Sequence, residues 1–438
     1  MATPLTEQIA LILSRHSATA AELAHALHVS QPSVSRALNS LGAMIVRIGR
    51  GRATRYGLIK KHEGRLACDP LFTIDAQGHA EHIATLYRLE SGESYIDCGH
   101  SHAWLLGTHG NGLFDDLPYY VLDMRPQGYL GRLVARYLAP ECPADLVQWQ
   151  STHIADYLLA YGQDTPGNLV LGDVEAASQP REIVVAIDER DREYGVLVAS
   201  TLAGDLPGSS AGGEQAKFLV TLRSNDGSMR RMIVKFSPPK DTPIGHRWAD
   251  LLIMERLALS VLARADIPVA TTTLFDTSNR TFLESERFDR IGLRGRAPMI
   301  SLSAIDAEFI GGHASWRATA AALLAQSRID RRTADQITLL DYFGELIANT
   351  DRHFHNISLT PTAAGTFQLC PVYDMLPMRY APRNEIVDLP RRQVTPRKSD
   401  ALWDRASQLA AEFWRAAQTE VGISPEFRRI ISVELNGS

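Results

Sequence analysis

Three polar residues in the C-terminal part of the chain have the types and spacing that phosphoryl transfer requires. Asp351 is followed five positions later by Asn356, and Asp374 lies in a later segment. A carboxylate such as Asp351 can accept the proton of an attacking hydroxyl, whereas an amide oxygen and a second carboxylate can hold Mg²⁺ against nucleotide phosphates. Zinc would favour Cys and His instead. A polar turn between a helix and a strand explains this short pattern equally well, so the upstream sequence must decide.

A loop of small residues upstream is typical of a segment that covers phosphates. Residues 206–217 contain Ser210, Gly213, Gln215 and Lys217, and they lead into an apolar segment, residues 218–222, that predicts a strand. Glycines let backbone N–H groups approach phosphate oxygens. The order of residues is not that of a Walker loop, and a linker explains the loop alone equally well.

Lys235 lies inside an apolar run, residues 232–236, that predicts a second strand. A lysine is costly to bury unless its charge is paired, and a phosphate is the expected partner. Glu255, on a helix expected around residues 250–262, is a candidate for the second counter-ion. Residues 281–290 predict a strand that ends in a charged segment, where a hinge backbone could meet adenine.

Taken together and in order, these motifs resemble those of the HipA-type serine/threonine kinase toxins. The similarity covers roughly residues 65–430 and includes five motifs, which are Ser210-x-x-Gly213-x-Gln215-x-Lys217, Val234-Lys235, Glu286-Arg287-Phe288-Asp289-Arg290, Asp351-x-His353-x-x-Asn356 and Tyr373-Asp374. The resemblance implies an ATP- and Mg²⁺-dependent protein kinase that acts as a growth-inhibiting toxin of a toxin–antitoxin system. Members phosphorylate aminoacyl-tRNA synthetases, and a separate helix-turn-helix antitoxin usually restrains them.

The resemblance also implies a role for each matched residue. Asp351 would be the catalytic base, Asn356 and Asp374 would bind Mg²⁺, and Ser210 would be the autophosphorylation site of the phosphate loop. The nucleotide would be bound by Ser210, Gly213, Gln215, Lys217, Lys235, Glu286, Arg287, Phe288 and Tyr373. The chain departs from the family pattern at His355, where a lysine is usual, and a neutral imidazole cannot stabilise phosphate charge as an ammonium does.

The N-terminal residues predict a winged helix-turn-helix, and carrying this domain in cis is the second departure from the family. Apolar periodicity indicates a helix from Leu5, a second after Thr19 and a third that Ser30 would cap. Two strands around residues 49–52 would form the wing. The expected DNA-contacting residues are polar side chains of the third helix and arginines of the wing: Gln31, Ser33, Ser35, Arg36, Arg47, Arg50, Arg52 and Arg55. A domain used for protein contact is the alternative.

Charge separates this head from the rest of the chain. The first 61 residues carry eight Lys and Arg against two Glu, a balance of +6, and because the whole chain carries −5 the remainder carries −11. A basic head on an acidic body indicates a polyanionic partner for the head only. The sequence shows no apolar run of membrane-spanning length and no paired spacing among its four Cys. We therefore expect a cytoplasmic protein with no membrane partner.

The expected fold is α+β, with the winged helix-turn-helix followed by a two-lobed kinase. The expected divisions are residues 1–60 for the DNA-binding head, 61–200 for a β-rich subdomain, 201–290 for the β-rich N-lobe and 291–438 for the helical C-lobe. Two other functions use the same residues. A metal-dependent DNA nuclease toxin could use the carboxylates and histidines around Asp351, and a transcription regulator could sense a nucleotide. Lys235 and the hinge favour the kinase, because a nuclease has no use for them.

Overall fold

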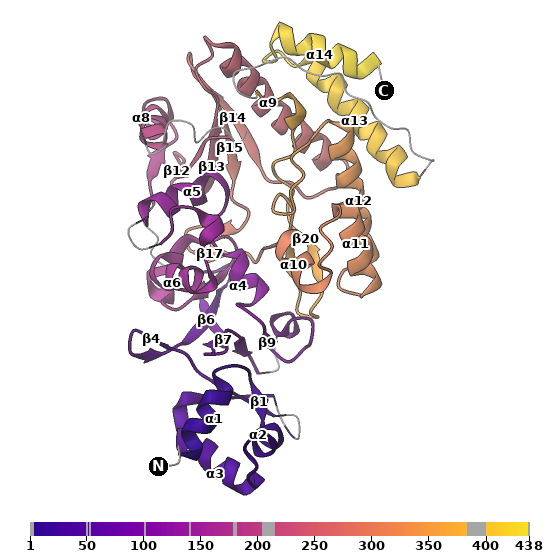
Figure 1. Ribbon diagram of the computed structural model, residues 1–438. Helices are drawn as coiled ribbons and strands as arrows, with labels where there is room; N and C mark the ends of the chain where they lie inside the picture. The colour runs from indigo at the N-terminus through magenta and orange to yellow at the C-terminus, as the bar shows by residue number, and fades with distance from the viewer. Residues whose placement is uncertain are drawn as a thin grey trace.

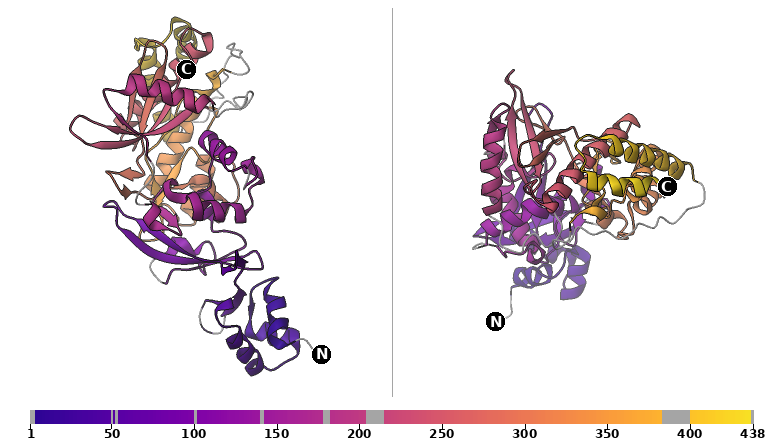
Figure 2. Two further views of the ribbon diagram at one scale, coloured as in Figure 1. Left: turned by 90° about the vertical axis from the view of Figure 1, so that its left-hand side faces the viewer. Right: turned by 90° about the horizontal axis from the view of Figure 1, so that it is seen from above.

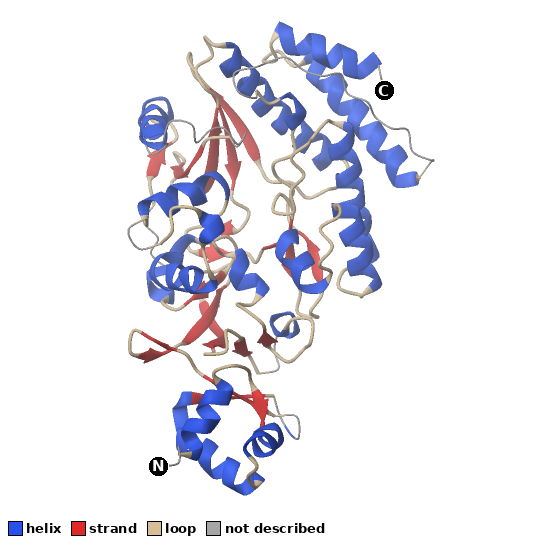
Figure 3. Ribbon diagram, viewed as in Figure 1, coloured by secondary structure: helices blue, strands red, loops and turns tan. Residues whose placement is uncertain are grey.

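The computed structural model describes residues 4–49, 51, 54–99, 102–139, 142–177, 182–203, 215–382 and 400–436. Figures 1 and 2 show an elongated molecule, with the N-terminal head at one end and the last two helices, α13 and α14, at the other. Strands and helices are interspersed along its length (Figure 3). Among the described helices, none has both the length and the apolar composition needed to cross a membrane.

The head consists of three helices and a small antiparallel sheet with strand order β1-β3-β2. Capping explains where the helices begin: the Thr19 side chain accepts from the backbone N–H of Glu22, and the Ser30 side chain accepts from that of Ser33. The buried residues of this unit include Ile9, Leu13, Leu23, Val34 and Leu38. Its elements are α1 (Leu5–Leu13), β1 (Ala18–Thr19), α2 (Ala20–Leu27), α3 (Gln31–Leu41), β2 (Ile45–Ile48) and β3 (Arg55–Leu58).

The head is docked firmly on the next unit. Ile48 and Ile59 form one buried cluster with Leu89 and Tyr95. The backbone continues the contact, because Lys60 N donates to Arg88 O at 2.8 Å and Glu90 N donates to Leu58 O at 2.9 Å. The carboxylate of Glu93 also accepts from the backbone N–H and hydroxyl of Ser17.

The middle unit is built on an antiparallel sheet with strand order β10-β6-β7-β8-β9. Large aromatic side chains fill its core, including Trp104, Tyr119 and Tyr120. A two-stranded hairpin of β4 (Lys61–His62) and β5 (Arg65–Leu66) precedes the sheet. The strands and helices are β6 (Cys68–Ile74), β7 (Ala80–Arg88), β8 (Ser94–Asp97), β9 (Leu113–Phe114), α4 (Tyr119–Asp123), α5 (Gly128–Tyr137), α6 (Ser151–Tyr161), β10 (Leu169–Leu171) and α7 (Val174–Ala177).

A second five-stranded sheet, of order β11-β12-β13-β15-β14, forms the next unit. Side chains alternate between its faces, so Val234 and Phe236 pack with Tyr194 of α8 while Lys235 points toward α9. Helices α8 and α9 therefore cover opposite faces (Figure 2). The elements are β11 (Val184–Ala186), α8 (Arg190–Ala203), β12 (Lys217–Arg223), β13 (Met229–Phe236), α9 (Pro243–Arg264), β14 (Thr272–Asp276) and β15 (Thr281–Glu286).

The start of this unit differs from the expected division at residue 201. Both β11 and α8 lie before that position, yet β11 pairs in parallel with β12, and Tyr194 of α8 belongs to the core of the second sheet. The two paired strands, β11 and β12, are far apart in the sequence, and no local pattern of residues predicts that they pair.

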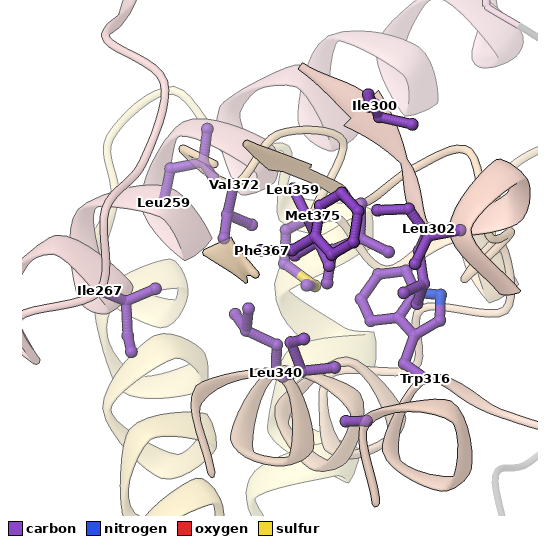
Figure 4. Packing of buried hydrophobic residues seen from close by; sticks show 14 of the residues in the cluster. Leu259, Ile267, Ile300, Leu302, Trp316, Leu340, Leu359, Phe367, Val372 and Met375 are labelled. Carbon is purple, nitrogen blue, oxygen red and sulfur yellow. The ribbon is translucent and has the colours of Figure 1, made fainter. Parts of the chain in front are cut away.

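The C-terminal unit is mainly helical and surrounds a small sheet of order β18-β19-β20. In its core, Leu340 of α12 and Trp316 of α11 converge on Phe367 and Met375 (Figure 4). Residues of α9, including Leu259, belong to the same core, so this unit and the second sheet are packed together. Its elements are β16 (Arg290–Ile291), β17 (Gly295–Arg296), β18 (Ile300–Ser301), α10 (Leu302–Phe309), α11 (Trp316–Ala325), α12 (Arg331–Leu346), β19 (Ser358–Pro361), β20 (Phe367–Leu369), α13 (Ala401–Thr419) and α14 (Pro425–Asn436).

Candidate active site

The segment that contains Asp351 is a loop held between α12 and β19. Buried Asn349 accepts from the backbone N–H of Asp351 at 2.9 Å. Arg352 turns back toward α12, where its Nε donates to the Asp341 carboxylate at 3.0 Å. A side chain at Gly344 would have no room, because its Cβ would lie 2.6 Å from Cδ of Arg352. The helix therefore fixes the loop from beneath.

Within this loop, Asp351 and Asn356 are joined directly. The amide nitrogen of Asn356 donates to the carbonyl oxygen of Asp351 at 2.7 Å, which leaves the amide oxygen as the group available to a cation. The Asp351 carboxylate is partly exposed, and Nε2 of His353 lies 2.7 Å from its Oδ1. The carbonyl of His353 accepts from the indole N–H of Trp316 at 3.2 Å. The loop thus presents a carboxylate and an amide oxygen on a rigid support.

Opposite the loop, Lys235 is held by two carboxylates. Its Nζ lies 2.7 Å and 2.6 Å from the oxygens of Glu255, and it also donates to Asp374. Burial alone would lower the pKa of Lys235, but Asp374 and Glu255 together raise it above its ordinary value. Burial opposes ionisation of Asp374 as well, yet Lys235 and then Lys217 lower the pKa of that carboxyl to about 2. Glu255 is therefore a counter-ion of Lys235, as expected, and Asp374 is a further carboxylate partner that the sequence did not indicate.

A cleft of about 1000 Å³ joins these two groups. It contains the residues of both walls, from β12, β13 and β15 on one side and from the Asp351 loop and Asp374 on the other. The expected site residues that line it are Gln215, Lys217, Lys235, Glu286, Arg287, Phe288, Asp351, Asn356, Tyr373 and Asp374. Ser210 and Gly213 lie outside the described residues.

Two of the expected nucleotide-binding residues have structural partners of their own. The guanidinium of Arg287 is paired with Asp164 at 2.8 Å and with Asp289 at 2.9 Å, so it joins the hinge to the middle unit. The hydroxyl of Tyr373 donates to His355 O at 2.8 Å and shares a hydrogen bond of 2.8 Å with Ser358. Its ring lies 5.9 Å from that of Phe288. Arg287 and Tyr373 therefore brace the cleft.

The donor set fits Mg²⁺ bound together with a nucleotide. Asn356 and Asp374 supply an amide oxygen and a carboxylate, and Mg²⁺ usually takes one or two carboxylates and completes its shell with phosphates and water. Across the part of the chain that the structure describes, no three or more His, Cys, Asp or Glu side chains are grouped so as to hold a metal ion.

One contact that shapes this site, between Asp123 and Ser301, was not predicted from the sequence. Asp123 of α4 accepts from the backbone N–H of Ser301 at 2.7 Å and also from the Ser301 hydroxyl, and burial raises its pKa. This contact brings the middle unit to the edge of the cleft. His355 is affected by it, because burial lowers the pKa of the imidazole while the charge of Asp123 opposes that change. No spacing signal connects Asp123 with a motif so far along the chain.

In the head, the expected DNA-contacting residues differ in their exposure and in their partners. Gln31, Ser35 and Arg36 are exposed on α3 and Arg47 is exposed on β2, whereas Ser33 is half-buried. Arg55 is engaged within the head, since its Nε donates to the Ser17 hydroxyl at 3.2 Å and its Nη1 lies 3.5 Å from Glu22. Arg50 and Arg52 lie outside the described residues.

Comparison with known proteins identifies the family. A family model described as the HipA-like C-terminal domain matches residues 209–435, and one described as the YjjJ-like toxin middle domain matches residues 67–179. Toxin YjjJ of Escherichia coli (strain K12) is 35% identical over 427 residues, which are 94% of this chain and 93% of that protein. This chain belongs to the HipA-type toxin family. The resemblance read from its motifs is confirmed.

Solved structures support the same fold for this HipA-type toxin. A chain from the complex of Shewanella oneidensis MR-1 HipA, HipB and operator DNA matches with a TM-score of 0.55. The match covers 84% of this chain and 96% of that one, at 14% identity, so it bears on the fold alone. The expected α+β class agrees with it. Both family models begin after the head of this HipA-type toxin.

Proposed function

We propose that this HipA-type toxin is an ATP- and Mg²⁺-dependent protein serine/threonine kinase that inhibits growth. The observation that carries the proposal is the set of buried Lys235 and Glu255 with half-buried Asp374, which faces Asp351 and Asn356 across one cleft. A buried lysine braced by a glutamate can bind phosphate oxygens without moving far. The acceptor belongs to the same proposal, and the family resemblance favours an aminoacyl-tRNA synthetase or another translation protein.

Each side chain has a defined part in the reaction. Asp351 accepts the proton of the acceptor hydroxyl as the new bond from that oxygen to the γ-phosphorus forms and the bond to the leaving ADP oxygen breaks. Lys235 binds phosphate oxygens of ATP. Asn356 and Asp374 would hold Mg²⁺, which supplies positive charge that neutralises the phosphates. Glu255 remains with Lys235 and keeps it directed into the cleft.

We also propose that the head is a winged helix-turn-helix that binds DNA. Its helices, the strand order β1-β3-β2, the exposed polar face of α3 and the charge of +6 over the first 61 residues support this role. The Shewanella complex contains an operator and HipB, and a comparable antitoxin for this chain is part of the proposal.

Incubation of the purified chain with γ-labelled ATP, Mg²⁺ and a cell lysate tests the kinase. We expect label on a serine or threonine of a protein, and no label with Asp351→Asn, whose amide cannot accept the proton. Circular dichroism of the variant should match that of the wild type, since Asp351 is partly exposed. Cleavage of DNA by the wild type together with no labelled protein would favour the nuclease instead.

A further inference from the structure

The cleft is lined not only by the second five-stranded sheet and the C-terminal unit but also by residues of the middle unit. Residues of the segment between α4 and α5 in the middle unit line it, and the chemistry-bearing one is Arg125. Arg125 is exposed, and its guanidinium makes no hydrogen bond or ion pair with any other residue that the structure describes. Two other cations that line the cleft differ from it, because Lys235 and Arg287 are each paired with two carboxylates.

The position of Arg125 is fixed by its neighbours. Two residues earlier, Asp123 is bonded to Ser301 of β18, and β18 pairs with β19, the strand that follows the Asp351 loop. On the other side, Gln127 Nε2 donates to Asp123 O at 3.1 Å. Gly131 lies so close to Pro126 that a Cβ would be 2.6 Å from its carbonyl carbon. The turn that carries Arg125 is therefore anchored to the same strands as the catalytic loop.

Arg125 also lines the same cleft as the Asp351 loop. His355 lines the same cleft, and the positive charge of Arg125 acts on its imidazole. Asp351, Asp374 and Glu286 line the same cleft, and the Arg125 guanidinium is paired with none of them, so it is available to the phosphate oxygens of a nucleotide.

We propose that Arg125 is a catalytic residue that contacts the transferring phosphoryl group and supplies positive charge to it from the middle unit. The inference rests on the proposed kinase function. While the acceptor oxygen bonds to phosphorus and ADP leaves, the phosphoryl oxygens carry negative charge, which a positioned guanidinium stabilises. The middle unit is then part of the catalytic site.

Kinetics of the full-length chain give the first test. Arg125→Ala should lower kcat for phosphate transfer about 100-fold, the cost typical of one lost transition-state contact, and should leave KM for ATP within about twofold. Arg125→Lys should recover part of the loss. Arg331→Ala, which removes an exposed arginine of α12 away from the cleft, serves as the matched control and should behave as wild type. An Arg125→Ala variant with wild-type kcat overturns the inference.

Binding measurements test the same contact without turnover. With Mg²⁺ present, calorimetry of ADP should give the same Kd for wild type and Arg125→Ala. Addition of aluminium fluoride, a planar mimic of the phosphoryl group, should then tighten ADP binding at least about tenfold more in the wild type than in the variant. Equal weakening of ADP with and without fluoride would assign Arg125 a structural role and overturn the proposal.

A lysine in place of His355, which lines the same cleft, gives a third test. His355→Lys in the Arg125→Ala background should regain at least about tenfold in kcat, because an ammonium would then stand beside the phosphoryl group. No gain overturns the proposal that Arg125 acts through its positive charge. The two proposals fail separately: a wild-type chain that transfers no phosphate overturns the kinase and with it Arg125, whereas an active Arg125→Ala variant overturns only the inference.

Discussion

Lys235 of β13 and Glu255 of α9 form a two-pronged ion pair between the second sheet and the helix that covers it. The Lys235 ammonium lies 2.7 Å and 2.6 Å from the two Glu255 oxygens, and the two residues are 5% and 1% exposed. Such a pair contributes little net stability because both charges are desolvated, but removal of one partner leaves an uncompensated charge. Its value here is positional, since it holds an ammonium at the surface of the cleft.

Lys235→Ala should therefore change two measured quantities. It leaves the carboxylates of Glu255 and Asp374 close together without their cation, so the free energy of unfolding should fall by about 3–5 kcal/mol. ATP binding, measured by calorimetry under folded conditions, should weaken by at least about tenfold. Lys240→Ala is the control, because its partner Asp276 is mostly exposed to solvent and the pair is worth about 1 kcal/mol or less. An unchanged affinity for ATP would exclude the proposed nucleotide position.

Acid should weaken the junction between the hinge and the middle unit. Burial would raise the pKa of Asp289, but Arg287 and Arg290 hold it well below its usual range. A depressed pKa in the folded state means that the stabilisation is complete above the unfolded pKa of about 4 and is lost as the pH falls below it. Asp289→Asn should thus lower the free energy of unfolding at neutral pH by about 3 kcal/mol and flatten its fall below pH 4.

Urea denaturation between about pH 2 and 7 measures this dependence. Asp335→Asn is a suitable control, since its carboxylate lies 3.9 Å from Arg331 in an exposed pair. If the Asp289→Asn curve runs parallel to that of the wild type, the network of Asp289 with Arg287 and Arg290 does not control acid stability.

DNA binding should depend steeply on salt. Replacement of Arg50 and Arg52 by alanine in the full-length chain should reduce the slope of log K against log salt by about two if each contacts one phosphate. Arg36→Ala on α3 should weaken binding, and Arg331→Ala should leave it unchanged. The full chain is needed because residues 1–60 alone would expose Ile48 and Ile59, which are buried against the middle unit. Identical slopes for variant and wild type would remove the wing from the interface.

Autophosphorylation at Ser210 should depend on the activity of the same chain. A phosphate there adds about −1.5 to −2 charges, and the phosphates of bound ATP are negative too, so under the proposed function the modified loop should be repelled and the kinase should turn itself off. Mass spectrometry of the wild type and of Asp351→Asn should find the phosphate on Ser210, or on neighbouring Ser209, in the wild type only. A loop that stays unmodified after long incubation, in a protein shown to bind ATP, would refute the scheme.

The sequence was informative where function requires particular residue types at short spacing. Asp351 with Asn356, and Lys235 within its apolar strand, could be proposed because each pattern is local and has a chemical reason, and the structure places all three in one cleft. Helix starts such as Ser30 were found for the same reason, since a cap is a local contact. Glu255 could be proposed as the partner of Lys235 because a buried lysine demands one.

What the sequence missed depends on contacts between distant segments. Nothing around Asp123 indicates that it bonds to Ser301, 178 positions away. Arg287 was expected to serve the nucleotide, but two carboxylates, one of them Asp164 of the middle unit, take up its guanidinium. The strand β11 was missed because its partner β12 follows only after α8. Such contacts depend on tertiary packing, which short-range patterns in the sequence do not reveal.

The short junction between the head and the rest of the chain attaches the head rigidly, not through a flexible linker. Only Ile59 and Lys60 separate β3 from β4, and their backbone N–H groups donate to Met44 O and Arg88 O at 2.8 Å each. A flexible tether would let the cleft sample many directions, and linker length would then set its effective concentration near a target. Here, a ligand bound to α3 would be kept at a fixed direction and distance from the cleft. Only an acceptor that lies in that direction could enter the cleft, and a higher local concentration elsewhere would not compensate.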